Sequence, residues 1–199
     1  MAGDEEGKNE VERAWLEGFQ VEQKAWSIRN FGDGPQHRPV VGMIEELGEL
    51  FEALEERNVL ASTDDDERCR AAIEDAVGDV IVYMVNVCWQ RGWLLADLWE
   101  TRFGVPDIAF KKDGSTLQSP VTHMRWLAHH QLKGEQHIRG GYEEHNNKMQ
   151  DRCRAILFLL DRVTAGRAMD VAAETWGRVR RRDWTKNPND AHAVAEQGG

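Results

Sequence analysis

Acidic side chains are the residues of this chain whose types and spacing could do chemistry. Residues 42–56, GMIEELGELFEALEE, contain six glutamates within an otherwise amphipathic helical pattern. At about 100° per residue the apolar side chains form one arc, and Glu46 and Glu49 lie together beside it. Glu45, Glu52 and Glu56 point more fully toward the solvated side. Glu46 and Glu49 are therefore candidate metal ligands.

A second set of polar side chains follows within a strongly apolar segment. Asp75, Asp79, Tyr83 and Asn86 are spaced by 4, 4 and 3 residues, which places them on one helical stripe about 80° wide. Carboxylates beside a core are costly unless they are paired or bound to metal. Oxygen ligands without Cys or His nearby suit Mg²⁺ or Mn²⁺. Two amphipathic helices with ordinary acidic flanks are the alternative interpretation.

Helices must position these two stripes. Periodicity predicts them at 9–29, 40–56, 66–90 and 94–103, with the Gly- and Pro-rich break NFGDGPQHRP after the first. The β-branched run VIVYMVNVC, within 66–90, is also compatible with a strand, but the helical spacing of the polar residues inside it favours a helix. Further helices are predicted in three later ranges, namely 120–133, 143–164 and 168–182. No convincing strand pair is present, so the predicted fold is all-α.

The helical pattern restarts after a linker, which indicates two halves. We place the first half at 9–104, the linker at 105–119, the second half at 120–188 and a disordered tail at 189–199. The segment EDAVGDVIVYMVNVCWQRGWLLADLWE aligns with QDRCRAILFLLDRVTAGRAMDVAAETW, although a match between two RCRA tetrapeptides competes with this alignment. A degenerate duplication predicts an intrachain pseudo-dimer whose second half has lost the acids.

Charge and composition limit the kinds of molecule that we expect this protein to bind. The net charge of −10 disfavours nucleic acid or an anionic membrane, but it allows a small phosphorylated ligand accompanied by Mg²⁺. The acidic start MAGDEEGKNE is unlike a signal peptide, and no apolar run approaches the ~20 residues of a membrane span. Three widely spaced cysteines without a CxxC indicate a reducing compartment. We therefore expect a cytoplasmic protein.

Two other clusters have ordinary explanations beside functional ones. The basic run RVRRRDWTK, residues 178–186, is typical of a helix C-terminus and is also suited to closing over a triphosphate. A zinc hypothesis is invited by four histidines, namely His123, His129, His130 and His137. Their spacings include no i, i+4 pair and no Cys partner. We therefore expect neither nucleic-acid binding nor a zinc site from these clusters.

The two acidic stripes together form a motif. EELGE followed by DAVGDVIVYMVN resembles the MazG-like all-α nucleoside triphosphate pyrophosphohydrolases, whose mark is EExxE on one helix and ExxD on the next. The segments NFGDGPQHRPVVGMIEELGEL and ETWGRVRRRDWTKNP are also similar to phage-like members of that superfamily. The resemblance covers 26–103 well and 174–188 moderately. It implies a helical bundle of a kind that usually forms homodimers.

Carried over by position, the resemblance implies metal ligands at Glu46, Glu49 and Asp79. Ala76 stands where the ExxD motif has Glu. We expect Asp75, the nearest acid, to replace that ligand, because it points only about 40° away from Asp79 on a helix.

The resemblance also implies roles around the metal. Glu45 would orient or deprotonate water beside the ligand Glu49, although a solvated Glu45 is an equally good interpretation. Substrate contacts are implied at six positions, namely Trp26, Tyr83, Asn86, Arg182, Lys186 and Asn187. Packing within the helices is the alternative for Tyr83 and Asn86.

The implied reaction is attack of a metal-activated water on the α-phosphorus of a nucleoside triphosphate, releasing a nucleoside monophosphate and pyrophosphate. The cofactor would be Mg²⁺, with Mn²⁺ as a substitute. The alternative function is a non-catalytic nucleotide-sensing or assembly module that kept the bundle and lost full activity with Ala76.

Overall fold

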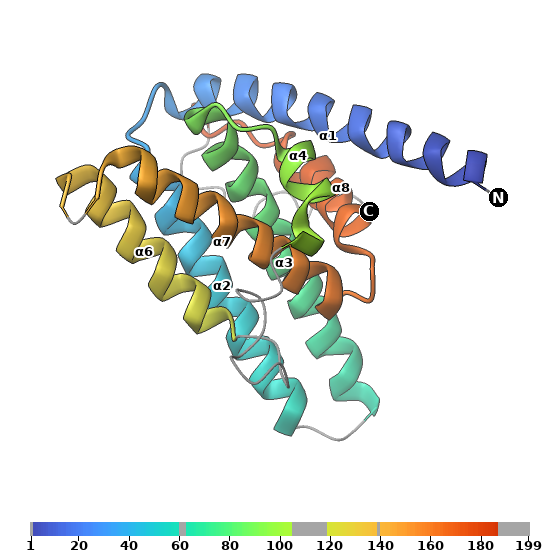
Figure 1. Ribbon diagram of the computed structural model, residues 1–199. Helices are drawn as coiled ribbons and strands as arrows, with labels where there is room; N and C mark the ends of the chain where they lie inside the picture. The colour runs from blue at the N-terminus through green and yellow to red at the C-terminus, as the bar shows by residue number, and fades with distance from the viewer. Residues whose placement is uncertain (1, 60–62, 105–118, 139, 187–199) are drawn as a thin grey trace.

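The computed structural model describes residues 2–59, 63–104, 119–138 and 140–186, and within these the fold is helical with no strand. The α-helices are α1 (Ala2–Phe31), α2 (His37–Val59), α3 (Thr63–Arg91), α4 (Leu95–Glu100), α6 (Pro120–Gln136), α7 (Tyr142–Val163) and α8 (Ala168–Val179), with a 3₁₀ turn η1 at Arg102–Gly104 (Figure 1). The all-α prediction is confirmed for this part of the chain. The tail 189–199 and the linker from residue 105 to 118 lie outside the described residues.

A hairpin of two long helices, α2 and α3, forms the centre of the molecule (Figure 1). Helix α3 also packs against α1 and α8, so it is covered on several sides. Val80, Ile81, Met84 and Val85 are all fully buried in it. This explains why the run VIVYMVNVC is apolar around most of its circumference, and the predicted helix at 66–90 is confirmed.

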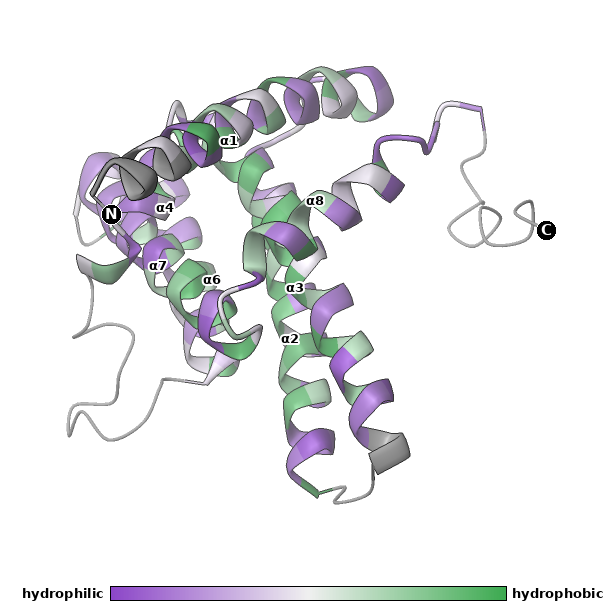
Figure 2. Ribbon diagram, turned by 90° about the vertical axis from the view of Figure 1, so that its right-hand side faces the viewer, coloured by the Kyte–Doolittle hydropathy of each residue, from purple (hydrophilic) through white to green (hydrophobic). Residues whose placement is uncertain are grey.

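A second hairpin, α6 and α7, packs beside the first through contacts between α6 and α2. The two shorter helices cross over between the halves: α4 packs against α7, and α8 packs against α3. Figure 2 shows α2 and α3 side by side, with α8 against α3 and the α6–α7 hairpin on the other side. No helix in the described part of the chain is long and apolar enough to cross a bilayer.

Helix α8 ends at Val179, earlier than the predicted end at residue 182. The chain then turns, with the Arg182 N–H donating to the Val179 carbonyl at 3.0 Å. Side chains of helix α1 form hydrogen bonds with the backbone beyond this turn. Trp26 Nε1 donates to the Arg182 carbonyl at 3.1 Å, and the Trp184 N–H donates to Asn30 Oδ1 at 2.8 Å. These contacts replace the helical hydrogen bonds that a longer α8 would have made.

Two glycines allow the helices around α3 to approach closely. A Cβ at Gly42 on α2 would collide with the ring of Tyr83, and a Cβ at Gly78 on α3 would lie 2.7 Å from the Thr175 Cβ. Thr175 is 2% exposed and cannot move away. The α3–α8 crossing therefore depends on the absence of a side chain at Gly78.

Gly78→Ala should lower the free energy of unfolding by about 1–3 kcal/mol relative to Gly177→Ala, because only the first substitution overpacks a helix crossing. Gly177 lies in α8 with nothing within 4 Å of its Cβ position. Both changes gain the same helix propensity, so their difference isolates the collision. Urea unfolding followed by circular dichroism measures it, and equal stabilities would contradict the described crossing.

Candidate functional site

The two acidic stripes lie on facing helices, Glu46 and Glu49 on α2 and Asp75 and Asp79 on α3. Glu46 and Asp79 are half-buried, whereas Glu49 and Asp75 are exposed. Glu45 is exposed next to Glu46. The arrangement therefore has two half-buried carboxylates at its centre and exposed ones around them.

Glu46 experiences the strongest electrostatic penalty in the acidic group. Its pKa is raised to about 8, first by burial and then by the charges of Asp79, Glu49, Glu45 and Asp75. Glu46 forms no ion pair or hydrogen bond with any residue that the structure describes. Its negative charge is consequently uncompensated, a state that is costly beside a core.

Asp79 carries a smaller penalty because cations lie near it. Its pKa is raised to about 6 by burial and by the charges of Asp75 and Glu49, while the charges of Arg182 and Arg178 oppose the shift. The charge of Asp79 on α3 raises the pKa of Glu46, and the charge of Glu49 on α2 raises the pKa of Asp79, so acids of the two helices lie close enough to interact electrostatically.

The donor chemistry suits a hard divalent cation, but the side chains do not form a ready-made cage. No group of three or more His, Cys, Asp or Glu side chains in the described ranges is close enough to hold a metal ion as it stands. The prediction that the four acids converge to metal-bridging distance is therefore not met by these rotamers. A metal would require Glu46, Glu49 and Asp79 to turn toward one another.

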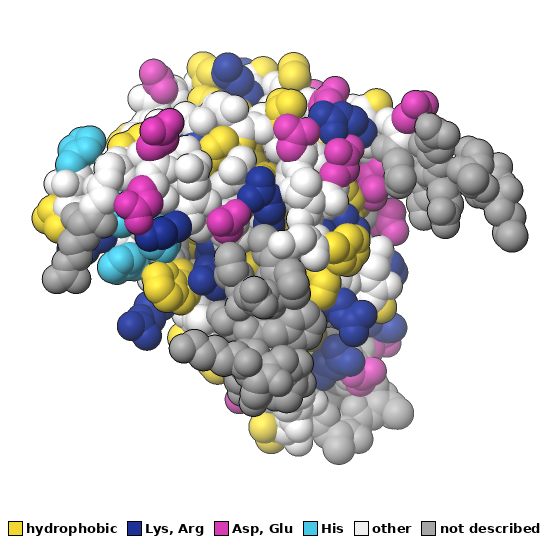
Figure 3. Space-filling view, viewed as in Figure 1, with side chains coloured by type: hydrophobic (Ala, Val, Ile, Leu, Met, Phe, Trp, Pro, Cys, Tyr) yellow, Lys and Arg dark blue, Asp and Glu magenta, His cyan; other side chains and the backbone are white. Residues whose placement is uncertain are grey.

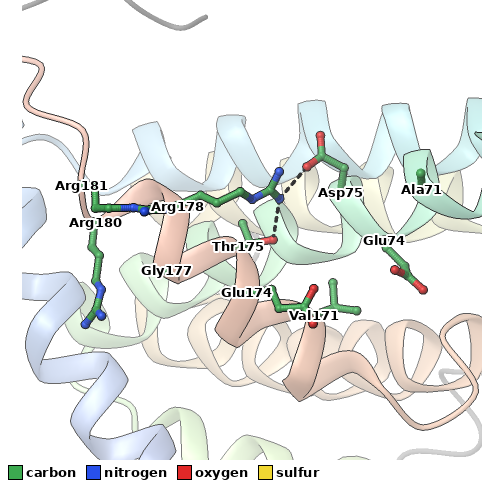
Figure 4. Close-up of a pocket in the computed structure, with 10 residues that line it drawn as sticks. All are labelled: Ala71, Glu74, Asp75, Val171, Glu174, Thr175, Gly177, Arg178, Arg180 and Arg181. Carbon is green, nitrogen blue, oxygen red and sulfur yellow. Dashed lines mark hydrogen bonds and ion pairs between the residues drawn. The ribbon is translucent and has the colours of Figure 1, made fainter. Parts of the chain in front are cut away.

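Asp75, the expected substitute for the missing motif Glu, is held elsewhere. Arg178 on α8 donates to Asp75 Oδ1 at 2.8 Å and to Thr175 Oγ1 at 3.1 Å (Figure 4). Ala76, at the motif position itself, is buried in the core at 3% exposure. Asp75 thus lies at the edge of the acidic group, and it pairs with a residue that the sequence prediction had not assigned to the site.

Arg178 also lines the cleft between α3 and α8, which has a volume of about 630 Å³. Arg180, Arg181 and Glu174 lie around it with Asp75 (Figure 4). Arg178 and Arg182 are separated by four residues, so a helical reading of the basic run could have placed both on one face. That spacing is the signal that would have identified Arg178.

Tyr83 and Asn86 continue the stripe away from the acids. Tyr83 is half-buried against Gly42, and burial together with the charges of Glu46, Glu45 and Asp79 raises its pKa. Asn86 donates from Nδ2 to Ser27 Oγ at 3.0 Å, while its buried Oδ1 has no hydrogen-bond partner among the described residues. An unpaired buried acceptor is unusual and suited to a ligand donor.

The remaining predicted substrate residues are distributed differently. Trp26 is 7% exposed and packs edge-on against Trp176 while it holds the Arg182 carbonyl. Arg182 is half-buried near Asp79, and Lys186 is exposed and pairs with Asp183 at 3.0 Å. Asn187 lies outside the described residues. Trp26 therefore positions the basic segment, a role that the prediction of a base contact did not include.

His129, His130 and His137 lie toward the α6–α7 turn, where cyan side chains are visible in Figure 3, whereas His123 lies in the first turn of α6 and contacts Arg152 at 3.3 Å. His130 Nδ1 lies 3.0 Å from Nδ1 of His145, a residue outside the predicted cluster. His145 Nε2 in turn donates to the Ile138 carbonyl at 3.1 Å. Burial lowers the pKa of His123 to about 3 and that of His130 to about 4, so both are neutral packing residues near pH 7.

Comparison of the chain with protein-family models, with curated proteins and with solved structures finds no match in any of the three. The resemblance to the MazG-like superfamily therefore depends on the motif residues of the sequence alone.

Glu46→Gln should stabilise the metal-free protein in a pH-dependent way. The folded-state pKa of about 8 exceeds the ordinary value of 4.5. Glu46 therefore destabilises the folded protein by an amount that grows as the pH rises between these two values. Gln does not ionise, and we expect a melting temperature about 2–6 °C above that of the parent at pH 8.5 and little difference at pH 5.

Thermal unfolding in a chelator measures this difference. Glu52→Gln is the matched control, because Glu52 is exposed on the same helix. It should follow the parent at both pH values. The acidic group is not repulsive if Glu46→Gln also follows the parent.

Proposed function

We propose that the protein is a nucleoside triphosphate pyrophosphohydrolase that depends on Mg²⁺ or Mn²⁺. The observation that carries the proposal is the position of the Glu46 carboxyl group, half-buried within the electrostatic reach of Asp79, Glu49, Glu45 and Asp75 and without a cationic partner among the described residues. A protein that needed these residues only for folding would be more stable with neutral ones. A site that binds a divalent cation requires them.

The proposed ligands are Glu46, Glu49 and Asp79, with Asp75 completing the set after release from Arg178. The Asp75–Arg178 pair is more than half exposed on the Asp75 side, and such pairs contribute only about 0–1 kcal/mol. Breaking this ion pair to release Asp75 therefore costs little free energy. When bound, the ion would supply neutralisation of the carboxylates, screening of the phosphate charge and a lower pKa for a bound water.

Arg178 and Arg182 are the proposed phosphate contacts. Both act electrostatically on Asp79, and the cleft beside Arg178 is open to a ligand. Guanidinium groups match phosphate oxygens with paired hydrogen bonds. If Asp75 turns toward the metal, Arg178 loses its partner as the triphosphate arrives, which couples phosphate binding to assembly of the acidic group.

Asn86 and Tyr83 are the proposed contacts to the nucleoside. The unpaired Asn86 Oδ1 accepts a hydrogen bond from a base or sugar donor, while Ser27 fixes the orientation of the amide through its Nδ2 contact. Tyr83 packs beside it with a ring suited to stacking. Glu45, exposed next to Glu46, can accept a proton from an attacking water without leaving the surface.

The packing of the two halves supports a degenerate pseudo-dimer. Each half contributes a long hairpin, and each short helix packs against the other half, α8 on α3 and α4 on α7. The alignment given above places Ala155 opposite Asp79, and Ala155 is fully buried. In this interpretation the second half supports the α2–α3 hairpin and binds no metal.

A second candidate function is a non-catalytic nucleotide-binding module. The ion pair between Asp75 and Arg178 favours it, because the fourth acidic side chain is already neutralised without metal. Such a module would bind a nucleotide through Arg178 and Arg182 and would not cleave it.

Glu49→Gln should abolish Mg²⁺-dependent release of pyrophosphate from nucleoside triphosphates and leave the circular dichroism spectrum unchanged. The substitution keeps the side-chain shape but removes one negative charge from a site that must hold a divalent ion. Metal contributes several kcal/mol to such transition states, so we expect a loss of at least about 100-fold in kcat/KM.

Glu52→Gln serves as the control and should retain parental activity. Equal activity of the two variants would remove Glu49 from the mechanism. A parent protein that binds nucleotides but releases no pyrophosphate from any of them, with Mg²⁺ or Mn²⁺, would establish the non-catalytic module instead.

A further inference from the structure

Helix α1 is apolar on two opposite faces, and the fold of one chain uses only one of them. Its inner face buries Leu16, Phe19 and Trp26 in the core. Its outer face carries small and apolar residues that are all exposed and are spaced alternately by three and four positions: Val11, Ala14, Gly18, Val21, Ala25 and Ile28. We call these six residues the outer stripe. In Figures 1 and 2, α1 lies across the top of the molecule with no described element on its outer side.

The spacing of the outer stripe is the heptad spacing of a helix that packs against another helix. Val11 is 72% exposed, Val21 is 70% exposed and Ile28 is 44% exposed. Gly18, at the middle, has nothing within 4 Å of its Cβ position. A glycine inside a helix costs about 1 kcal/mol relative to alanine, and no neighbour among the described residues requires it. A second helix in close contact would.

Charged residues beside the stripe select the direction of that second helix. Glu17 and Lys24 precede stripe positions on one flank, and Glu22 and Arg29 follow stripe positions on the other. In a parallel pair of α1 helices these flanks would meet as Glu17 with Glu22 and as Lys24 with Arg29, which are like charges. In an antiparallel pair Glu17 of each chain would meet Lys24 of the other. Of the two directions, only the antiparallel one therefore brings opposite charges together, as two Glu17–Lys24 pairs.

We propose that the outer stripe is a self-association surface on which α1 pairs antiparallel with α1 of a second copy. The two-fold axis passes between Gly18 and Val21, so that each Gly18 receives the partner's Val21. Ala14 then meets the partner's Ala25, and Val11 meets the partner's Ile28. Small residues at the centre let the helices approach, and the larger apolar residues close the ends.

The present contacts of Glu17 and Lys24 leave these two side chains able to serve the interface. Glu17 pairs with Arg13 at 3.0 Å, with both side chains more than a third exposed, and Lys24 lies 5.6 Å from the Trp89 ring centroid. Exposed contacts of this kind contribute little and rearrange readily. The proposed face lies on the side of α1 away from α3, so association leaves the acidic group accessible.

Sedimentation velocity of the full chain over a concentration series tests the proposal. The parent should show a reversible monomer–dimer equilibrium. Val21→Glu places two charges at the centre of the interface and should raise the dimer dissociation constant at least about tenfold. Val121→Glu is the control, because Val121 is exposed at 45% on α6, away from the stripe. It should behave as the parent.

Charge reversal tests the antiparallel arrangement separately. Glu17→Lys and Lys24→Glu each create two like-charge pairs across the axis and should weaken the dimer about fivefold. The double variant restores opposite charges and should return to within about twofold of the parent. Circular dichroism verifies that each variant is folded.

A parent that stays monomeric at every concentration, or a Val21→Glu variant that dimerises like the parent, would overturn the proposal. Failure of the double variant to recover would overturn the antiparallel pairing. Pyrophosphate release plays no part in these readouts, so the outcome is independent of the proposed function.

Discussion

The cost of placing carboxylates against one another beside a core is the constraint on which the rest of the structure depends. Glu46 and Asp79 are half-buried on facing helices, and their raised pKa values reflect both lost hydration and repulsion by neighbouring carboxylates. Two apolar residues at these positions would make a simpler hairpin. The buried framework must therefore be stable enough to hold the acids in place, and a bound cation would relieve the repulsion that the framework sustains.

That framework is built around α3, which is enclosed by α1, α2 and α8. Gly42 and Gly78 set how closely its neighbours approach, and each contact has a consequence at the site. The contact at Gly42 seats Tyr83 beside Glu46, and the contact at Gly78 brings Thr175 and Arg178 beside Asp75. The same packing that stabilises the bundle thus determines which cation meets which acid.

Helical periodicity was enough to predict the all-α fold, the α2–α3 hairpin and the two acidic stripes, because spacing along a helix directly fixes which residues share a face. It could not predict the partner of Asp75, since that pair depends on the angle at which α8 crosses α3. The hydrogen bond from Trp26 to the Arg182 carbonyl was also beyond the sequence, because it depends on the return of residues 180–186 onto α1. His145 was overlooked for the same reason: only the turn between α6 and α7 brings it to His130.

Binding of Mn²⁺ to the metal-free protein, followed by isothermal titration calorimetry, tests the central claim most directly. The account predicts saturable binding by the parent at pH 8, because a larger fraction of Glu46 is ionised there than at lower pH. It predicts loss of that binding in Asp79→Asn. It also predicts proton release on binding at pH 7, because the pKa of Glu46 is raised to about 8. Absence of saturable binding, or equal affinity in the parent and Asp79→Asn, would contradict it.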